Sequence, residues 1–441
     1  MKKILLIGNG AREHVIAETL LRSKSGAEVV VFGSAKNPGL LPISSAYEVG
    51  NLSDFDKIKD FAKHTRPDYA IVGPEAPIAG GIVDMLKEIG VKSASPFMAT
   101  GALESSKSFA RDLLAKYKIP GNPKFKVFHD ADGLRNFIEK DLSGNYVVKA
   151  DGLKSGKGVK VSGDHLFTTD EGVAYAEQCL KEDGKVMVEE KFIGQEFSLM
   201  SFVDGENVAS MPAVQDHKRA YDGDKGPNTG GMGSYSCADH SMPFLNASDL
   251  QDAHDINVAV AKAVYEETGV YYKGIMYGGF IAVKNGVRLI EYNVRFGDPE
   301  AMNVLPILRT DFSEICQAII AGELKGMKIK FEKKATVCKY LVPDGYPDKP
   351  VKGVKIEIGD IPEGVKTYYA SVDQRDDGLY LGGSRAVAFV GMADNLEDAS
   401  AIATSALGSV KGPVFYRKDI GTKELIGKRV EMMGEVRGVV S

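Results

Sequence analysis

The sequence contains few cysteines and no long hydrophobic run, and each absence excludes a class of protein. Its four cysteines are far apart and include no CxxC pair, which argues against a disulfide framework or a zinc site and indicates reduced thiols. No stretch is long and apolar enough to span a bilayer. The apolar run at 4–7 ends before Gly8 and is too short for a signal peptide. We therefore expect a cytoplasmic protein without a membrane partner.

Positive charge is not in excess either. The formal net charge of −5 leaves no electrostatic footprint for nucleic acid or for an anionic membrane. The 441 residues are too many for one hydrophobic core, so we expect on the order of two to four domains.

The first hundred residues alternate between strand-like and helix-like patterns. Short apolar strands are predicted at 4–7, 29–32, 69–72 and 91–93, and helices at 12–22, 55–64 and 82–89. This order predicts a doubly wound parallel sheet, whose ligands bind beyond the carboxyl ends of the strands.

Two loops follow strands of this predicted sheet. In the first, Gly8 and Gly10 can bring backbone N–H groups close to a phosphate. Glu13 occupies the third glycine position of a dinucleotide fingerprint, however, and a structural turn is an equally good interpretation. In the second loop, Glu75 can bind a sugar hydroxyl or an amine, or it can cap the helix that follows.

A glycine-rich hairpin lies further along the chain. A predicted strand carries Lys149, the loop 152–158 follows, and another strand begins at Val159. The loop offers backbone donors to phosphates, and the lysine adds a positive charge. It is not a P-loop, because it lacks G-K-[ST] and a following helix. We interpret it as a nucleotide-binding hairpin, with a flexible charged hairpin as the alternative.

Two further segments have the polarity of binding loops. An apolar strand at 186–189 runs into an extended connector, which can bind an adenine edge or can be a solvated strand end. The segment 215–233 is long, glycine-rich and dense in charges of both signs. Loops of this length within compact domains are functional or disordered, and the mixed charge favours a loop that covers a substrate.

The most informative stretch is EYNVR at 291–295. It continues a strand-like run, so Glu291, Asn293 and Arg295 share one face. Carboxylate and amide oxygens suit Mg²⁺, which normally also binds nucleotide phosphates. A guanidinium can stabilise charge on a transferring phosphoryl group. The alternative is an ordinary exposed strand with a charged face.

These motifs follow one another in an order that resembles the ATP-grasp enzymes, and more narrowly the phosphoribosylamine–glycine ligase family. The resemblance is carried by GNGAREH from Gly8, VGPEAPIAGGIVD from Val72, ESSKSFARDLL from Glu104, VVKADGLKSGKGV from Val147, QDHKRAYDGDKGPNTGGMGSYS from Gln215 and EYNVRFGDPEA from Glu291. It implies an α/β and α+β multidomain fold. The implied parts are an N-terminal doubly wound parallel sheet (1–103), an ATP-grasp core (104–123 and 190–330), a small lid subdomain (124–189) and a C-terminal β-rich domain (331–441).

The resemblance also implies an activity. It is the ADP-forming ligation of glycine to 5-phosphoribosylamine through glycyl phosphate, in purine biosynthesis, with ATP and Mg²⁺ or Mn²⁺. The implied partners are these small molecules, with no nucleic acid and no membrane, and the implied state is a cytoplasmic monomer.

Residue roles are implied in the same way. Arg295 and Lys149 are the implied catalytic residues, and Glu291 and Asn293 the implied metal ligands. The implied ATP contacts are Lys107, Lys149, Gly152, Ser155, Gly156, Gly158, Glu189, Glu190, Phe192, Ile193 and Glu196. The implied glycine and phosphoribosylamine contacts are Gly8, Gly10, Glu75, Asp216, Lys218, Asn228, Arg295 and Asp298.

Alternatives remain open at this level. A purine enzyme that uses formate or bicarbonate would share Lys149, Glu291 and Asn293, but not the loop 215–233. A nucleotide-binding regulatory protein could keep the fold without turnover, although a complete set of charged groups argues against it. A nicotinamide oxidoreductase is the weakest option. The strand at 279–283 carries no acidic residue, so the ligands of a second metal stay open.

Overall fold

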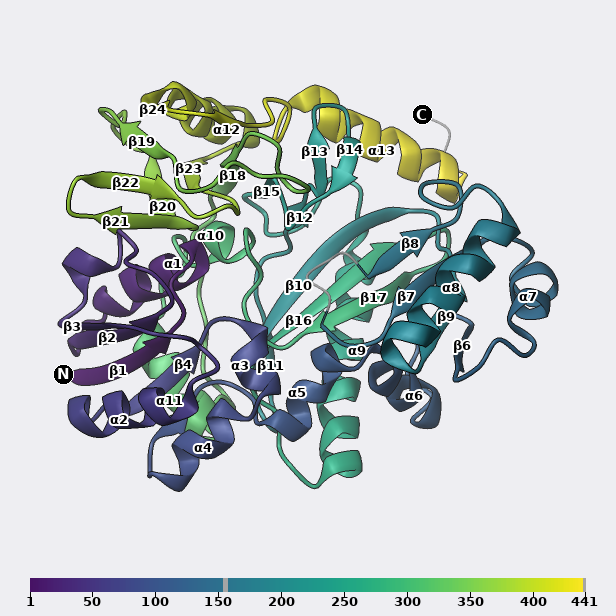
Figure 1. The fold of residues 1–441 in the computed structure, drawn as a ribbon, viewed down its shortest axis with the longest axis horizontal. Coiled ribbons are helices and arrows are strands. Elements are labelled where there is room, and N and C mark those ends of the chain that lie inside the picture. The colour runs from purple at the N-terminus through teal and green to yellow at the C-terminus, as the bar shows by residue number, and fades with distance from the viewer. Residues whose placement is uncertain (154–157, 439–441) are drawn as a thin grey trace.

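The structure is a computed structural model and describes residues 1–153 and 158–438 (Figure 1). Its first part is a parallel sheet in the order β3-β2-β1-β4-β5. The strands are β1 (Lys2–Ile7), β2 (Ala27–Gly33), β3 (Ala46–Val49), β4 (Tyr69–Val72) and β5 (Lys92–Ser93), and the main helices between them are α1 (Ala11–Leu21), α2 (Phe55–Thr65) and α4 (Ile82–Glu88). The strand order reverses between β1 and β4, which brings the loops after these two strands together at one edge.

The apolar residues of 103–117 lie on one side at helical spacing and predict a single helix, and this prediction is wrong. The structure has two helices, α5 (Met98–Ser105) and α6 (Lys107–Lys116), separated by Ser106 in an extended conformation. The hydroxyl of Ser106 accepts the N–H of Phe109, and the Asp151 carboxylate accepts the N–H of Lys107 at 2.6 Å. A new helix starts here because its first N–H groups find acceptors outside the preceding helix.

A small antiparallel sheet in the order β6-β9-β7-β8 follows and has its own hydrophobic core. Its elements are β6 (Phe125–Phe128), β7 (Tyr146–Ala150), β8 (Val159–Val161), β9 (Val186–Glu190) and helix α8 (Thr169–Asp183). We call this sheet the lid sheet. In Figure 1 it lies beside β17, the edge strand of the central sheet described next.

The central sheet is antiparallel, in the order β11-β10-β16-β17. Its strands are β10 (Gln195–Asp204), β11 (Val208–Ser210), β16 (Lys273–Ala282) and β17 (Val287–Asn293), with helix α9 (Ala247–Thr268) packed against it. Gly279 pairs with Glu291, whereas Phe280 pairs with Leu289, so Ile290 is an extra residue in a β-bulge. A bulge bends a strand and redirects its side chains, and this one lies directly before Glu291.

The C-terminal sheet, in the order β12-β15-β18-β23-β20, includes two strands from the middle of the chain. Those strands, β12 (Gln215–Asp216) and β15 (Gly233–Ser236), are the two ends of the polar segment 215–233. The others are β18 (Ala335–Pro343), β20 (Lys366–Tyr369) and β23 (Val387–Ala393), and β25 (Val414–Phe415) also pairs with β18. Both ends of the predicted substrate loop are therefore fixed in a sheet built mainly from residues after 331.

Further elements complete this part of the molecule. A second antiparallel sheet joins β21 (Val372–Arg375), β22 (Gly378–Leu381), β19 (Lys355–Ile358) and β24 (Val410–Lys411). Helix α12 (Leu396–Ser405) packs on β23 and β18, and the charged tail forms helix α13 (Lys423–Arg437). The predicted fold class, with a parallel N-terminal sheet, an ATP-grasp core and a β-rich C-terminal region, is confirmed.

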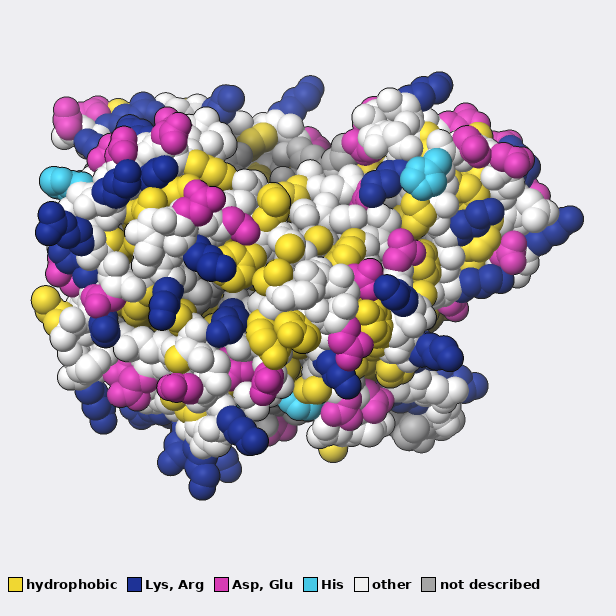
Figure 2. Space-filling view, turned by 90° about the horizontal axis from the view of Figure 1, so that it is seen from below, with side chains coloured by type: hydrophobic (Ala, Val, Ile, Leu, Met, Phe, Trp, Pro, Cys, Tyr) yellow, Lys and Arg dark blue, Asp and Glu magenta, His cyan; other side chains and the backbone are white. Residues whose placement is uncertain are grey.

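The surface agrees with the small net charge. On the face drawn in Figure 2, basic and acidic side chains are interspersed, with hydrophobic side chains between them. Within the described ranges, no helix has the length and apolar character needed to cross a bilayer.

Close packing of α12 on β23 generates a testable prediction. A Cβ atom added at Gly391 would lie 2.0 Å from the carbonyl oxygen of Ala399 and 2.8 Å from the nitrogen of Ala403. We expect Gly391→Ala to destabilise the protein by about 1–3 kcal/mol, because helix backbone cannot yield as a flexible side chain can. Thermal unfolding measures this loss. The control is Gly408→Ala, where no atom lies within 4 Å of the added methyl group; equal stability of the two variants would contradict the packing argument.

Candidate active site

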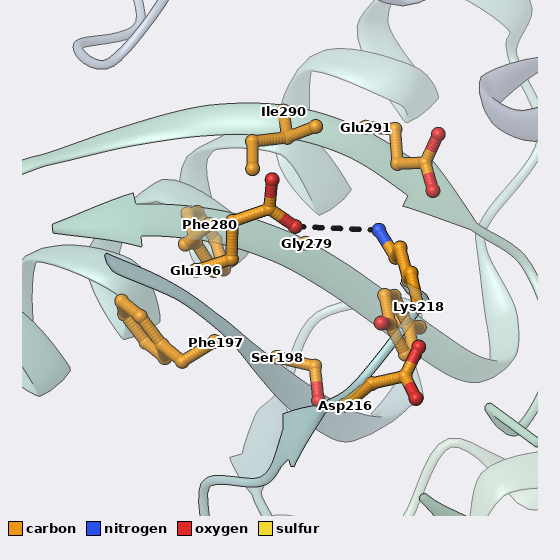
Figure 3. A pocket seen from close by; sticks show the side chains of 10 residues that line it. Glu196, Phe197, Ser198, Asp216, Lys218, Gly279, Phe280, Ile290 and Glu291 are labelled. Carbon is orange, nitrogen blue, oxygen red and sulfur yellow. Dashed lines mark hydrogen bonds and ion pairs between the residues drawn. The ribbon is translucent and has the colours of Figure 1, made fainter. Parts of the chain in front are cut away.

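A polar pocket opens between β10, β16, β17 and the first strand of the 215–233 segment (Figure 3). Lys218 points toward Glu196 at one side, the Glu291 carboxylate lies on the opposite strand, and Asp216 lies below them. The pocket is lined by Glu196, Phe197, Ser198, Asp216, Lys218, Tyr277, Gly279, Phe280, Ile290 and Glu291. Four residues of the predicted site thus meet here.

The bulge at Ile290 links this pocket to the lid sheet. The Ile290 carbonyl accepts hydrogen bonds from Lys149 Nζ at 2.9 Å and from Arg111 at 2.7 Å. Lys149 belongs to β7 of the lid and Arg111 to α6, so one carbonyl group joins three elements. Glu291 is the next residue, and its position follows from the same contact.

Glu189 lies in a buried ion cluster. Its carboxylate pairs with Arg111 at 2.8 Å and also with Lys149, and all three side chains are almost fully buried. Burial opposes the charge of Glu189, but Arg111 and Lys149 outweigh burial and hold its pKa below the usual value. Burial lowers the pKa of Lys149 against the attraction of Glu189. Arg111 is not among the site residues that the sequence predicts, although it lies one turn after Lys107 in α6.

The lid and α6 also meet at the start of the glycine-rich loop. Lys107 Nζ donates to the carbonyl of Gly152 at 2.7 Å. Asp151 accepts from Ser108 Oγ at 2.8 Å and pairs with Lys185, and its pKa is lowered to about 2 by these partners despite burial. Gly158 is buried at the far side of the loop. Two predicted ATP contacts, Ser155 and Gly156, lie outside the described residues.

The predicted ATP contacts on the connector after β9 lie in different surroundings. The Glu190 side chain is exposed and accepts the backbone N–H of Lys124 at 3.3 Å. Phe192 is half-buried and Ile193 is exposed. Glu196 is the second residue of β10, and its carboxylate accepts a hydrogen bond from Lys218 at 3.4 Å, at the pocket.

Charge within the pocket is distributed between Lys218 and three acids. Glu196 raises the pKa of Lys218, and burial of Glu291 is outweighed by Lys218, Lys149 and Lys107, which lower the Glu291 pKa. Burial raises the pKa of Asp216 well above its usual value. One oxygen of Asp216 is buried without a hydrogen-bond partner among the described atoms. A buried acceptor in this state favours a ligand that brings a donor.

The outer part of the 215–233 segment is a hairpin of β13 (Arg219–Tyr221) and β14 (Lys225–Asn228). Arg417, a fully buried arginine, pairs with Asp224 at 3.0 Å and with Asp419 at 2.8 Å, and Arg429 of α13 also pairs with Asp224. This hairpin is therefore tied to the last part of the chain. The predicted substrate contact Asn228 has an exposed side chain at the end of β14.

Arg295 lies just beyond the end of β17 and joins the site to the N-terminal sheet. It contacts Glu75 at 3.3 Å, Glu104 at 2.8 Å and Asn293 at 3.1 Å. Glu104 also accepts the N–H of Val294 at 2.7 Å. Burial nevertheless raises the pKa of Glu104, against the effect of Arg295.

The glycine loop after β1 has an internal partner. The Glu13 carboxylate folds back, accepts the N–H of Gly10 and pairs with Arg12 at 2.7 Å. Gly8 has a φ of 116° and lies against Glu13 and Pro74, so it has no room for a side chain. The donor of Gly10 is thus used in capping α1. The buried His14 packs against Tyr368 and Tyr369, and burial lowers its pKa to about 4.

The remaining predicted residue, Asp298, lies between the site and the C-terminal sheet. It accepts a hydrogen bond from Tyr340 at 2.6 Å and pairs with Arg385 at 3.3 Å.

The donor set of β17 fits a hard cation. Glu291 is held ionised by three lysines, and the amide oxygen of Asn293, which also accepts a hydrogen bond from Arg295, lies two residues away. Within 1–153 and 158–438, no three or more His, Cys, Asp or Glu side chains lie together in a group that could hold a metal ion by themselves. A cation at Glu291 and Asn293 would complete its coordination with phosphate oxygens and water, as Mg²⁺ commonly does.

The lid sheet, the central sheet and the E-x-N-x-R strand define an ATP-grasp ligase. Residues 2–104, 105–301 and 336–423 match the N domain, the ATP-grasp (A) domain and the C domain of phosphoribosylglycinamide synthetase. The chain belongs to the phosphoribosylglycinamide synthetase family.

Two relatives that match this chain over nearly their full length are both named phosphoribosylamine–glycine ligase. The phosphoribosylamine–glycine ligases of Methanosarcina acetivorans and Pyrococcus furiosus are each 46% identical to this chain, over 439 and 441 residues. These alignments cover 100% and 99% of this chain, and 99% and 98% of the relatives.

Solved structures show the same architecture. The crystal structure of phosphoribosylamine–glycine ligase from Thermotoga maritima has a TM-score of 0.78 at 28% identity, covering 95% of this chain and 99% of that chain. Biotin carboxylase from Campylobacter jejuni has a TM-score of 0.71 at 17% identity, covering 98% of both chains, and shares the fold.

The Arg295 contacts predict a dependence of stability on pH. Burial opposes ionisation of Glu75, but Arg295 and Arg12 outweigh it and lower its pKa to about 2. Because this is below the ordinary value of 4.5, the ionised carboxylate stabilises the folded state fully above about pH 4.5, and this stabilisation is lost as the pH falls toward 2. We expect the stability difference between the wild type and Glu75→Gln, measured by urea unfolding, to be constant near neutrality and to shrink in acid. Glu88→Gln, on an exposed side chain of α4, is the control. A difference that grows on acidification would refute the assignment.

Proposed function

We propose that this protein ligates glycine to 5-phosphoribosylamine, consuming ATP and releasing ADP and phosphate, with glycyl phosphate as the intermediate. The product is glycinamide ribonucleotide. The observation that carries the proposal is the pocket of Figure 3, where the side chains of Glu291, Lys218 and Asp216 line one cavity. Family membership and the names of the full-length relatives support the choice of substrates.

The reaction needs two transfers. In the first, an oxygen of the glycine carboxylate attacks the γ-phosphorus of ATP, the bond to the β-phosphate oxygen breaks, and ADP leaves. In the second, the amine of 5-phosphoribosylamine attacks the acyl carbon, phosphate leaves with the bonding electron pair, and the amine loses a proton. Activation is necessary because a free carboxylate is a poor electrophile. The intermediate reacts readily with water, so the site must exclude water.

The predicted site residues fall into two groups, one assigned to ATP and the other to glycine and 5-phosphoribosylamine. We assign Lys149, Lys107 and the glycine-rich loop, with Gly152, Ser155, Gly156 and Gly158, to the ATP phosphates. Arg295 stabilises negative charge that develops during transfer. The connector with Glu190, Phe192 and Ile193 is assigned to adenine, and Glu196 to the ribose. Glu189 acts through Lys149, which it holds in place.

The side of the pocket formed by Asp216 and Lys218, called its amino-acid end below, is assigned to glycine because of the charges of these two residues. The glycine ammonium group can donate to Asp216, whose buried oxygen lacks a partner, and its carboxylate can pair with Lys218. Glu75, Asn228, Asp298 and the Gly8–Gly10 turn are assigned to the phosphoribosylamine side. Mg²⁺ or Mn²⁺ at Glu291 and Asn293 would neutralise phosphate charge.

The substrate assignment is tested by ADP release from the purified protein with Mg-ATP. We expect release only when glycine and freshly prepared 5-phosphoribosylamine are both present, because the acyl phosphate forms productively only when an acceptor can consume it. Single omissions are the controls. Release with formate or bicarbonate in place of glycine would move the protein to another ATP-grasp reaction, and ATP binding without any release would indicate a non-catalytic protein.

The metal assignment is tested by Glu291→Ala. We expect ADP release to fall by at least about 100-fold, because a group that stabilises transition-state charge typically contributes this much. The thermal unfolding temperature should change little, since Glu291 lines a pocket rather than the core. Glu363→Ala, on an exposed residue of the C-terminal region, is the matched control. Wild-type turnover in Glu291→Ala would overturn the assignment.

A further inference from the structure

The residues after 331 do more than pack against the core, because one of their arginines reaches the edge of the site. Arg385 lies between β22 and β23 and is 13% exposed. Its guanidinium donates to the carbonyl of Asp298 at 2.7 Å and to that of Gly231 at 3.2 Å, and also to the carbonyl of Gly230. It pairs with the Asp298 carboxylate at 3.3 Å. One side chain thus binds two separate loops.

Two tyrosines of the same region complete this contact. Tyr340 is fully buried on β18, lies 4.7 Å beneath the Arg385 guanidinium and donates to Asp298 at 2.6 Å. The hydroxyl of Tyr346 accepts the N–H of Gly230 at 3.2 Å. Side chains of the C-terminal region therefore bind both carboxylate oxygens of Asp298. They also bind the N–H of Gly230 and the carbonyl groups of Gly230 and Gly231.

These two loops border the amino-acid end of the pocket. Gly231 has a φ of 111°, and a Cβ atom there would lie 2.6 Å from Asp216 and 2.7 Å from Pro299. The Gly230–Gly231 backbone is consequently pressed between the carboxylate that lines the pocket and the residue that follows Asp298. A shift of this backbone would move the surroundings of Asp216, whereas Lys149 and Glu291 are fixed through the lid and β17.

We propose that Arg385, supported by Tyr340, is a positioning residue that sets the geometry of the Asp216 side of the pocket and thereby the affinity for the amine-bearing substrates. The inference rests on the proposed function and adds a role for the C-terminal region. Arg385 suits this task because its planar group presents several donors at fixed angles. A lysine can replace the charge but not the set of three carbonyl contacts.

The first test compares kinetic constants in three variants. Arg385→Met should raise the KM for glycine by about 10-fold or more, because small misplacements at a site are costly, while the KM for ATP stays within about 2-fold. Arg385→Lys should recover part of the loss. Tyr340→Phe removes one hydrogen bond and keeps the ring, so it should show a smaller change in the same direction.

The matched control is Arg437→Met. Arg437 is equally buried, at 12% exposure, and joins α13 to the buried Asp249 at 2.9 Å and to the carbonyl of Val283. It connects the C-terminal region to the core without touching the pocket. We expect Arg437→Met to lower the unfolding temperature as Arg385→Met does, with both KM values unchanged. A rise of both KM values together in Arg385→Met, or the same kinetic change in Arg437→Met, would show that Arg385 is merely structural.

A second readout does not depend on the substrates. Hydrogen exchange of the backbone amides at 229–232 should be faster in Arg385→Met than in the wild type, and unchanged in Arg437→Met. Unaltered exchange in Arg385→Met would overturn the positioning role. If the wild type released no ADP with glycine and 5-phosphoribosylamine, the proposed function would fail, while the exchange comparison would still decide the role of Arg385.

Discussion

The buried ion cluster of Arg111, Glu189 and Lys149 is the constraint on which the nucleotide side of this structure depends. A buried carboxylate must have partners, because an uncompensated buried charge costs several kcal/mol. Here the partners come from α6 and from β7 of the lid, and both also donate to the Ile290 carbonyl. Helix, lid and central sheet are forced to meet at one point. Because Glu291 follows Ile290, the candidate metal ligand takes its position from that requirement.

The amino-acid side of the pocket depends on a different support. A segment as polar as 215–233 buries too little apolar surface to order itself. Its ends are strands of the C-terminal sheet, its hairpin is held by Arg417, and its Gly230–Gly231 turn is held by Arg385. The last part of the chain therefore orders the walls of a site whose lining residues all come before 300.

Much of the fold could be predicted from local patterns. Buried strands such as β1 and β4 are short apolar runs between polar loops, and their alternation with helices defines a parallel sheet. The break at Ser106 could not be predicted in this way, because the acceptor that starts α6 is Asp151, which is distant in sequence. The bulge at Ile290 was hidden for the same reason, since it depends on the register between β16 and β17.

The sequence by itself determined which chemistry is available: an ionisable carboxylate, an amide and a guanidinium on one strand, a lysine before a glycine-rich loop, and a polar segment with both signs of charge. Tertiary structure decided which of these groups face a ligand. It buried Glu189 as a partner of Lys149 and Arg111, used the Gly10 amide to cap α1, left Asn228 exposed, and brought Arg385 to Asp298. The physical reason is that the role of a charged group depends on its partners and its burial, and both are set by residues far away in the chain.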